Sequence, residues 1–463
     1  MAAYVEDTIA AIATAPGPGA ISILRVSGRE ARAVAARILR AGAGRAVPLE
    51  LADSHRARTA RLVRAPDGDP IDDVLVVPML EPRSYTGEDT IEIHCHGGRV
   101  IADLALRAAL TAGARSARPG EFTERAFLNG RLDLCQAEAV ADMIAANSEA
   151  GLEAARRQLD GELSRKVASE RDRILDTRAL VEAHLDFPED DLPPGVEAEL
   201  QADIQGVQGE LRALAETFAR GRLVRDGLRV VLIGKPNVGK SSLLNALLGR
   251  DRALVSAEPG TTRDYLEEPL AIGPLQVLLC DTAGIREAEG DVERAGVERS
   301  AERLAEADVV VLVLDGSRAL EPADQALYGR IGTTPVVAVR NKSDLTPVWE
   351  RPDGGWGGLS FLSVSATTGE GVAELTAAVE RAAPEMEGRQ DGVLVTNARH
   401  YERLERATTA LEEAADLLRG EEGELDLVAA ALQLACSALD DLVGRTDNED
   451  VLDRVFSRFC LGK

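Results

Sequence analysis

Hydrophobic and polar positions divide the first part of the chain into short strands and a helix. Residues 90–96 alternate polar and apolar side chains with a period of two, which is typical of a strand with one buried face. Successive side chains of a strand point to opposite faces, so Glu92, His94 and His96 share one face. This face also allows a metal site, although no third ligand is evident beside the two histidines. We expect further strands at 9–13, 21–26 and 74–79 and a helix at 100–112. These elements predict an α/β domain over residues 1–120.

Two later stretches show the three- and four-residue spacing of apolar positions that is typical of amphipathic helices. They cover residues 121–222 and 386–463, with helices of the second stretch expected at 394–418, 423–443 and 448–459. Between them, residues 223–385 alternate strand and helix patterns, which predicts a parallel α/β sheet. We therefore expect one helical-bundle domain built from two chain segments, with an α/β domain inserted between them. Such an insertion is tolerated where the two ends of the inserted domain lie close together.

Four short motifs follow apolar strand-type runs within the inserted domain. They are GKPNVGKS at 234–241, DTAG at 281–284, NKSD at 341–344 and SVSA at 363–366. The glycines of the first motif let backbone N–H groups approach phosphate oxygens at the N-terminus of the following helix. The order of the four motifs predicts a P-loop, Ras-like G domain that binds GTP and GDP.

Each motif is predicted to supply a different part of the nucleotide site. Lys240 would contact the β- and γ-phosphate oxygens, and Ser241 and Thr262 would bind Mg²⁺. The Asp344 carboxylate would accept hydrogen bonds from guanine N1 and N2, which adenine cannot donate. The other residues predicted at the nucleotide are Asn237, Val238, Gly239, Ser242, Ser256, Ala257, Glu258, Pro259, Gly260, Thr261, Asp281, Thr282, Ala283, Gly284, Asn341, Lys342, Ser365, Ala366 and Thr367.

Two positions depart from the simplest switch GTPase. Ile285 follows Gly284, where a hydrolytic glutamine often stands, and isoleucine cannot orient a water molecule. Asn237 lies inside the P-loop, where its amide could help to bind a monovalent cation beside the phosphates. The predicted K⁺ ligands are Asn237, Ser256, Glu258 and Thr261. The alternative for Asn237 is a turn residue after Pro236, a place that asparagine favours.

Composition and charge indicate the state of the thiols, the strength of nucleic-acid binding and the location of the protein. The five cysteines are scattered without CxxC spacing among 463 residues, which is typical of reduced thiols. A formal net charge of −25 argues against non-specific coating of nucleic acid, whose affinity comes from phosphate neutralisation. Arg220, Arg222, Arg225 and Arg229 could contact RNA phosphates, although a solvated linker is the favoured alternative. The start of the chain lacks a signal-peptide pattern, and no run approaches the about 18 apolar residues of a membrane span. We expect a cytoplasmic protein.

Further motifs extend over essentially the whole chain and carry a resemblance. They are DTIAAIAT at 7–14, ILRVSG at 23–28, SYTGED at 84–89, RPGEFTERAFLNG at 118–130, GTTRD at 260–264 and FCLGK at 459–463. On these motifs the chain resembles the MnmE (TrmE) family of tRNA-modification GTPases.

The resemblance implies a fold, an activity and partners. The fold is an N-terminal folate-binding-like domain that also dimerises, a helical domain and an inserted G domain. The activity is GTP hydrolysis that needs Mg²⁺ and is stimulated by K⁺ through transient pairing of two G domains. The implied partner is an FAD-containing MnmG-type protein, in a heterotetramer with a homodimer of this chain. Together they would install an aminomethyl-type group at C5 of the wobble uridine of certain tRNAs, using 5-formyl- or methylene-tetrahydrofolate as the one-carbon source.

The resemblance also assigns roles to individual residues. Glu293 matches the family's water-orienting glutamate and would form the catalytic set with Lys240 and Thr262; its alternative is a solvated surface charge. The folate-type site carries over onto Arg25, Glu92, Arg131 and Lys463. Cys460 is a candidate reactive thiol or, alternatively, a small buried residue. Pro18 stands where relatives commonly carry arginine, so the resemblance assigns no charged contact to this position.

Two other functions compete with this interpretation. A GTPase that times ribosome assembly would need a basic RNA-binding module beside the G domain, and none is visible in this acidic chain. An interaction scaffold with a degenerate GTPase would have lost residues such as Lys240, Asp281 and Asp344, which are intact. The sequence does not indicate which tRNAs are modified or which nitrogen donor is used.

Overall fold

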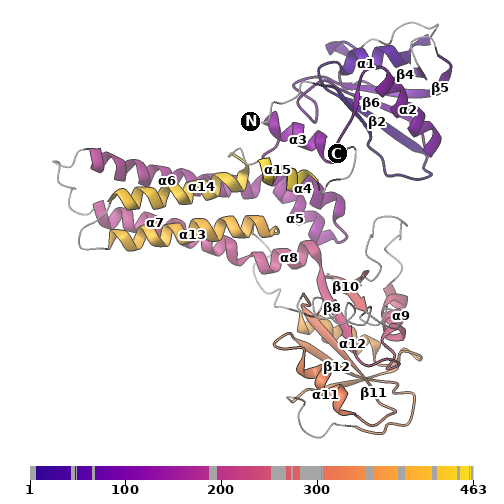
Figure 1. Cartoon of the computed structure of the whole chain (residues 1–463), viewed down its shortest axis with the longest axis vertical. Coiled ribbons are helices and arrows are strands. Elements are labelled where there is room, and N and C mark those ends of the chain that lie inside the picture. The colour runs from indigo at the N-terminus through magenta and orange to yellow at the C-terminus, as the bar shows by residue number, and fades with distance from the viewer. Residues whose placement is uncertain are drawn as a thin grey trace, which may run out of the picture. The chain divides into compact units, whose positions relative to one another are not determined.

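The computed structural model divides the chain into two compact units (Figure 1). One unit comprises Met1–Ala145, Ala155–Ala215 and Arg399–Lys463, and the other comprises Ala146–Ala154 and Glu216–Ala398. The structure describes residues 7–42, 47, 49–64, 68–186, 196–251, 267–272, 275–281, 304, 306–350, 356, 358–383, 392–419, 425–445, 449–457, 459 and 462.

The N-terminal part of the first unit is a seven-stranded sheet with strand order β3-β4-β5-β6-β2-β1-β7. Its strands are β1 (Ile9–Ile12), β2 (Ile21–Ser27), β3 (Leu39–Arg40), β4 (Arg58–Val63), β5 (Pro70–Met79), β6 (Thr90–His96) and β7 (Arg115–Ser116). All neighbours pair antiparallel except β1 and β7. Two helices, α1 (Ala31–Ile38) and α2 (Arg99–Thr111), cover one face and bury the apolar core against it. The predicted strands and helix are confirmed, whereas β3, β4 and β7 were not predicted.

The alternation of β6 has the expected consequence. Ile91 and Ile93 are fully buried under the two helices, and Glu92 and His94 lie on the other face. In the register of β2 with β6, Arg25 is the partner of Glu92. Sheet pairing therefore brings together two residues that are 67 positions apart in the chain.

Helices from both ends of the chain build the remainder of the first unit. They are α3 (Glu121–Leu128), α4 (Leu134–Ala145), α6 (Glu162–Asp186), α7 (Val196–Glu216), α13 (Ala398–Leu418), α14 (Leu425–Val443) and α15 (Glu449–Phe456), with α5 (Glu149–Leu159) continuing into the other unit. Helices α6 and α14 lie side by side (Figure 1), and the Arg171 guanidinium binds the Asp440 carboxylate at 2.6 Å between them. The predicted helical domain of two chain segments is confirmed.

The second unit contains a six-stranded sheet with strand order β13-β12-β11-β8-β10-β9. Its strands are β8 (Leu228–Ile233), β9 (Glu267–Ile272), β10 (Leu275–Asp281), β11 (Val309–Asp315), β12 (Val336–Asn341) and β13 (Phe361–Val364). Pairing is parallel except at the edge strand β9, so the predicted parallel α/β sheet is confirmed. Helices α9 (Lys240–Asp251) and α12 (Val372–Ala382) pack on one face and α11 (Pro322–Gly329) on the other. Burial of both faces explains the apolar runs at residues 230–233 of β8 and 309–314 of β11.

The topology places the nucleotide motifs at one edge of this sheet. Strands β10 and β11 lie on opposite sides of β8, so the strand order reverses at β8. Ligands of open α/β sheets bind outside the carboxyl ends of the strands at such a reversal. In the part of the chain that the structure describes, no helix is long and apolar enough to cross a membrane.

Candidate functional site

The P-loop joins β8 to the N-terminus of α9 and has the conformation that phosphate binding requires. Gly239 has a φ of +98°, and a Cβ atom at this position would lie 2.3 Å from Asn341 Nδ2. Only glycine therefore fits between the loop and the base-recognition motif. Asn237 adopts a left-handed φ of 65°, which asparagine tolerates better than most residues. The loop ends at the first turn of α9, whose N–H groups and dipole favour an anion.

The Lys240 side chain folds back along this loop. Its ammonium donates hydrogen bonds to the carbonyls of Gly234 at 2.7 Å and Lys235 at 2.9 Å. Lys240 is only 5% exposed, so the loop itself places the charge. An ammonium in this position can exchange backbone carbonyls for phosphate oxygens when a nucleotide binds. Ser241, the next residue, is exposed at the start of α9, where its hydroxyl fits the predicted Mg²⁺ ligand.

Asn341 links three of the four motifs. It ends β12 and is 1% exposed. Its amide nitrogen donates to the Val238 carbonyl in the P-loop at 2.8 Å, and its amide oxygen accepts from the Ala366 N–H at 3.3 Å. The amide therefore fixes the spacing between the phosphate loop and the base loops.

The Asp344 carboxylate, which is predicted to read the base, is oriented by a buried hydroxyl. Ser365 is fully buried and donates its hydroxyl to Asp344 Oδ1 at 2.6 Å. Asp344 itself is exposed, as a ligand-binding group must be. Thr368 donates its backbone N–H to Ser365 Oγ at 3.1 Å, which holds the serine in turn. The arrangement presents a carboxylate edge with a defined orientation.

A second group of predicted residues meets on the N-terminal sheet. Arg25 donates from Nε at 3.0 Å and from Nη2 at 2.8 Å to Glu92 Oε1. Its guanidinium lies 5.8 Å from the centre of the Tyr85 ring and 5.6 Å from that of the Phe122 ring. Arg25 Nη1 also donates to the Gly462 carbonyl at 3.2 Å, so the end of the chain reaches this pair. Cationic and anionic groups are thus held together between two aromatic side chains.

Arg131, His94 and His96, which the sequence also singled out, do not contact the Arg25 side chain in the same way. Arg131 is exposed in the turn after α3, where its side chain lies beside Gly87. His94 Nε2 lies 3.3 Å from Glu92 Oε2, and His96 Nδ1 lies 2.7 Å from Asp72 Oδ1. The two histidines of this face therefore pair with different carboxylates.

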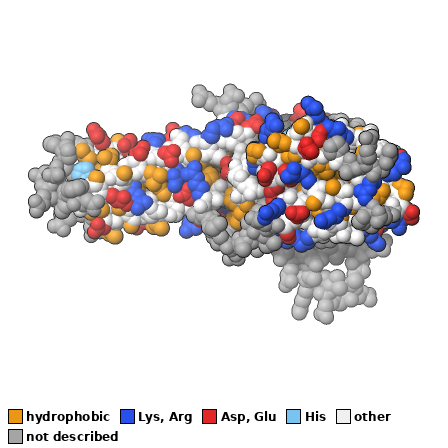
Figure 2. Space-filling model, turned by 90° about the horizontal axis from the view of Figure 1, so that it is seen from above, with side chains coloured by type: hydrophobic (Ala, Val, Ile, Leu, Met, Phe, Trp, Pro, Cys, Tyr) orange, Lys and Arg blue, Asp and Glu red, His pale blue; other side chains and the backbone are white. Residues whose placement is uncertain are grey.

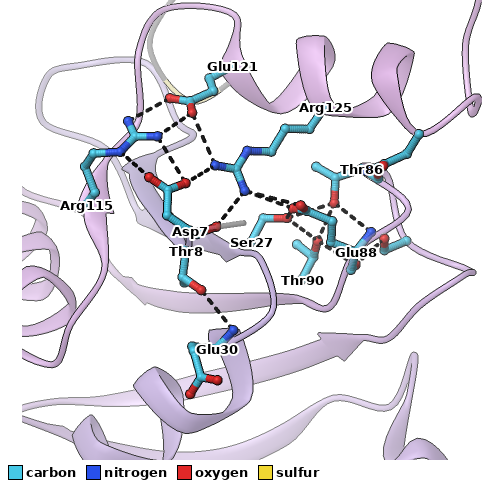
Figure 3. Close-up of polar contacts among 12 residues, drawn as sticks. Asp7, Thr8, Ser27, Glu30, Thr86, Glu88, Thr90, Arg115, Glu121 and Arg125 are labelled. Atoms are coloured by element: carbon cyan, nitrogen blue, oxygen red, sulfur yellow. Dashed lines mark hydrogen bonds and ion pairs between the residues drawn. The ribbon is translucent and has the colours of Figure 1, made fainter. Parts of the chain in front are cut away.

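Three motifs of unassigned role converge on a buried ionic cluster (Figure 3). Arg125 is 3% exposed and donates to Asp7 Oδ1 at 2.5 Å, to Glu121 Oε1 at 3.3 Å and to Glu88 Oε2 at 3.2 Å. Arg115 bridges Asp7 at 2.7 Å and Glu121 at 2.6 Å. Burial opposes ionisation of Asp7 and Glu121, but hydrogen bonds from the guanidinium groups outweigh it and lower the pKa of both carboxyls. At Glu88, burial prevails and raises the pKa.

Sequence comparison decides the family. A profile described as "GTP-binding protein TrmE N-terminus" matches residues 8–131, and one described as "MnmE helical domain" matches residues 134–460. The chain belongs to the MnmE (TrmE) family.

Individual relatives agree with this membership over their full length. The tRNA modification GTPase MnmE of Heliobacterium modesticaldum is 44% identical over 468 residues, covering 99% of this chain and 100% of the relative. The protein of the same name from Symbiobacterium thermophilum is 44% identical over 461 residues with the same coverage. Among solved structures, a point variant of Aquifex aeolicus Era bound to GDP and AlF₄⁻ is 29% identical, covers 42% of this chain and 68% of that chain, and has a TM-score of 0.27. The predicted family and GTPase class are confirmed by the sequence relatives.

Part of the predicted MnmE site lies outside the described residues. These positions are Ser256, Ala257, Glu258, Pro259, Gly260, Thr261, Thr262, Thr282, Ala283, Gly284, Glu293, Cys460 and Lys463. Asp281 is the last residue of β10, at the carboxyl edge of the sheet. All four predicted K⁺ ligands, Asn237 among them, and the water-orienting Glu293 stay predictions.

The basic run before the G domain is largely engaged with carboxylates. Arg222 contacts the Asp308 carboxylate, and Arg229 Nη1 lies 2.9 Å from Glu306 Oε2. On the face shown in Figure 2, Lys and Arg side chains are interspersed with Asp and Glu side chains. These ion pairs favour a structural role of Arg222 and Arg229, which differs both from the solvated linker that the sequence favoured and from RNA binding.

Sequence reasoning missed two residues that contact predicted site residues. Tyr85 stacks on Arg25 and is held by a hydrogen bond of its hydroxyl with Thr123 Oγ1 at 2.9 Å. Asp315 ends β11 and binds the Lys342 ammonium at 2.6 Å. The second had a readable signal, because a carboxylate that ends a buried strand falls at the same sheet edge as the nucleotide motifs.

Proposed function

We propose that this MnmE-family GTPase hydrolyses GTP in a reaction that needs Mg²⁺ and K⁺, and thereby drives modification of the wobble uridine in certain tRNAs. The product would carry an aminomethyl-type group at C5, with its one-carbon unit taken from a tetrahydrofolate derivative. The observation that supports this most is the convergence of the P-loop, NKSD and SVSA motifs through Asn341, in a chain whose relatives are tRNA modification GTPases over their full length.

In the proposed nucleotide site, each group has one task. Lys240 and the N–H groups at the start of α9 neutralise and orient the phosphates. Mg²⁺ would be held by Ser241 and Thr262, and it would bridge phosphate oxygens. Asp344 selects guanine, and Glu293 would orient the attacking water, a task that Ile285 cannot perform.

K⁺ dependence provides the first test of this site. Asn237→Ala should remove the advantage of K⁺ over Na⁺ in GTP turnover and reduce turnover in K⁺ by about 10²-fold, because a positive charge beside the transferred phosphoryl group is lost. GTP affinity should fall less than turnover, since alanine keeps the P-loop backbone bonds but costs about 1–2 kcal/mol in the left-handed conformation of this position. Turnover measured in KCl and in NaCl tests this expectation. Gln325→Ala, an exposed position on α11, provides the matched control. Equal K⁺ stimulation in wild type and Asn237→Ala would contradict the cation site.

The folate site is proposed at Arg25 and Glu92, with Arg131 and Lys463 contributing. A carboxylate can accept from the N–H edge of a pterin, and a guanidinium can bind the glutamate carboxylates of a folate. The fixed ion pair between the Tyr85 and Phe122 rings fits such a ligand, since it presents an acceptor and donors on one sheet face.

Loss of the guanidinium should weaken folate binding. Arg25→Gln is expected to reduce affinity for 5-formyltetrahydrofolate by about tenfold or more, because a charge-assisted hydrogen bond contributes about 1.5–3 kcal/mol. Isothermal calorimetry on the full chain measures this change. Arg107→Gln removes an exposed arginine of α2 in the same domain and should bind like wild type. Unaltered affinity in Arg25→Gln would place the ligand elsewhere.

The remaining assignments concern assembly and location. We propose that the chain forms a homodimer through its N-terminal domain and that its G domains pair transiently. The partner would be an FAD-containing MnmG-type protein, and the complex would work in the cytoplasm. The domain limits proposed are 1–120, 121–222 with 386–463, and 223–385.

A further inference from the structure

Lys342 connects the base-recognition loop to the P-loop. It adopts a left-handed φ of 66° at the end of β12. Its ammonium donates to the backbone carbonyl of Asn237 at 3.0 Å and to Asp315 Oδ2 at 2.6 Å. The side chain is therefore stretched between two fixed points, with its aliphatic stem beside the place where Asp344 reads the base. Without such anchors, a lysine side chain would lose about 2 kcal/mol of rotamer entropy on becoming ordered.

Asp315 is a rigid anchor for this lysine. It is the last residue of β11 and lies opposite Asn341 in the register with β12. Its Oδ1 atom accepts from the Ser317 N–H at 2.9 Å and from the Ser317 hydroxyl at 2.6 Å, so one carboxylate oxygen is fixed by the turn. Burial opposes ionisation of this carboxyl, but the hydrogen bonds from Lys342 and Ser317 lower its pKa. The other oxygen, Oδ2, faces Lys342.

A tryptophan side chain contacts the backbone of Asp315. Trp349 Nε1 donates to the Asp315 backbone carbonyl at 3.1 Å, and the Trp349 ring packs edge-on against Phe361 with centroids 5.5 Å apart. The chain has 2 tryptophans, and the second, Trp356, also packs against Phe361. One of the two tryptophan fluorophores, Trp349, therefore lies beside Asp315.

We propose that Asp315 is a positioning residue of the guanine-nucleotide site, which holds Lys342 along the base and against the P-loop and thereby slows nucleotide release. Asp315 does not touch the nucleotide itself. It acts by keeping the lysine ordered, so that base binding does not have to restrict the side chain. The inference rests on the nucleotide site and is independent of the tRNA and folate roles.

A double-mutant cycle in the full chain tests the proposal. Stopped-flow release of a fluorescent GDP analogue is measured for wild type, Asp315→Ala, Lys342→Ala and the double variant. Asp315→Ala should release GDP about tenfold faster, which corresponds to about 1.4 kcal/mol. The double variant should release GDP no faster than Lys342→Ala alone, because the carboxylate acts only through the lysine. Additive effects of the two substitutions, or a wild-type rate in Asp315→Ala, would overturn the proposal.

Two further variants separate positioning from a structural role of the turn. Ser317→Ala removes the hydroxyl that donates to Asp315 Oδ1 but keeps the backbone N–H bond of residue 317 and the Lys342 contact, so its release rate should stay within about twofold of wild type. A tenfold faster release in Ser317→Ala would mean that the turn, not the lysine, sets the rate. If Asp315→Ala does not fold, Asp315→Asn completes the same cycle with Lys342→Ala, and additivity there counts equally against the proposal. Unchanged tryptophan emission confirms that each folded variant keeps the Trp349 contact.

Discussion

Replacing Arg125 by alanine is expected to destabilise the N-terminal domain by about 3–5 kcal/mol, the usual cost of removing one partner from a buried ion pair. Arg125 serves Asp7, Glu88 and Glu121 at once. Its loss would leave Glu121, which is 3% exposed, and the desolvated Glu88 with a much smaller compensating charge. Because Asp7 precedes β1 and Glu121 begins α3, both elements should open more readily.

Hydrogen–deuterium exchange of the full chain measures this effect where it occurs. Amides of β1 and α3 should exchange faster in Arg125→Ala, while amides of β8 in the other unit keep their wild-type rates. Arg118→Ala provides the matched control, since Arg118 belongs to the same motif but its side chain is 60% exposed, pairs mainly with Glu124 and reaches Glu121 only at 3.7 Å. Such a pair contributes about 0–1 kcal/mol. Equal exchange in Arg125→Ala and Arg118→Ala would contradict the structural role of the cluster.

The cluster also gives stability a pH dependence with a defined sign. The folded-state pKa values of Asp7 and Glu121 lie below their unfolded values. Their contribution is therefore complete above about pH 5 and is lost as the pH falls through the folded-state values. Glu88 has a raised pKa and the opposite sign, so protonation removes a cost there. In Arg125→Ala, acidification should accordingly recover part of the stability that the variant lacks at neutral pH.

Replacing Asp344 by asparagine should change the base specificity of the G domain. The carboxylate accepts two hydrogen bonds from guanine, whereas an asparagine amide presents a donor that matches the C2 carbonyl of xanthine. In Asp344→Asn, this amide donor would face the 2-amino group of guanine, which is also a donor, and both would be left without an acceptor. We therefore expect GTP affinity to fall by about 10³-fold or more. The Ser365 hydroxyl can still donate to the asparagine oxygen, which keeps the loop in place.

Competition binding with GTP, XTP and ATP measures this change. XTP should bind Asp344→Asn more tightly than GTP does, and wild type should show the reverse order. ATP should bind neither protein, because adenine carries its amino group at C6. Retention of GTP preference in Asp344→Asn would mean that Asp344 does not read the base.

Particular elements show how far the sequence could predict this structure. The alternation at 90–96 predicted the exposed face of Glu92, because a period of two follows from strand geometry alone. The pairing of Glu92 with Arg25 needed the register of β2 with β6, which no local pattern contains. The two-residue strands β3 and β7 escaped prediction, since so short a run has no periodicity.

For the motifs too, the sequence predicted where the elements lie along the chain but not which residues contact one another. The helical periodicity on both sides of 223–385 predicted the inserted G domain. The strand order, which no local pattern contains, places its P-loop and base-recognition motifs at one edge of the sheet. The motifs at 84–89 and 118–130 carried the family resemblance, but their sequences did not predict the ionic cluster that they form. Only the fold brings Arg125 to Glu88 and Asp7. Buried charge is arranged by tertiary contacts, and sequence spacing does not report them.

The central claim is that GTP hydrolysis by this G domain drives tRNA modification, and reconstitution with altered base specificity tests it most directly. Extract from cells that lack the chain, depleted of GTP, supplies the partner, the tRNA and the nitrogen donor, and methylenetetrahydrofolate is added. Wild type or Asp344→Asn is then supplied with GTP or XTP, and nucleoside mass spectrometry measures C5-aminomethyl-type uridine. The account predicts the modified uridine only for wild type with GTP and for Asp344→Asn with XTP. Modification that is equal in all four combinations, or absent while XTP is hydrolysed by Asp344→Asn, would contradict it.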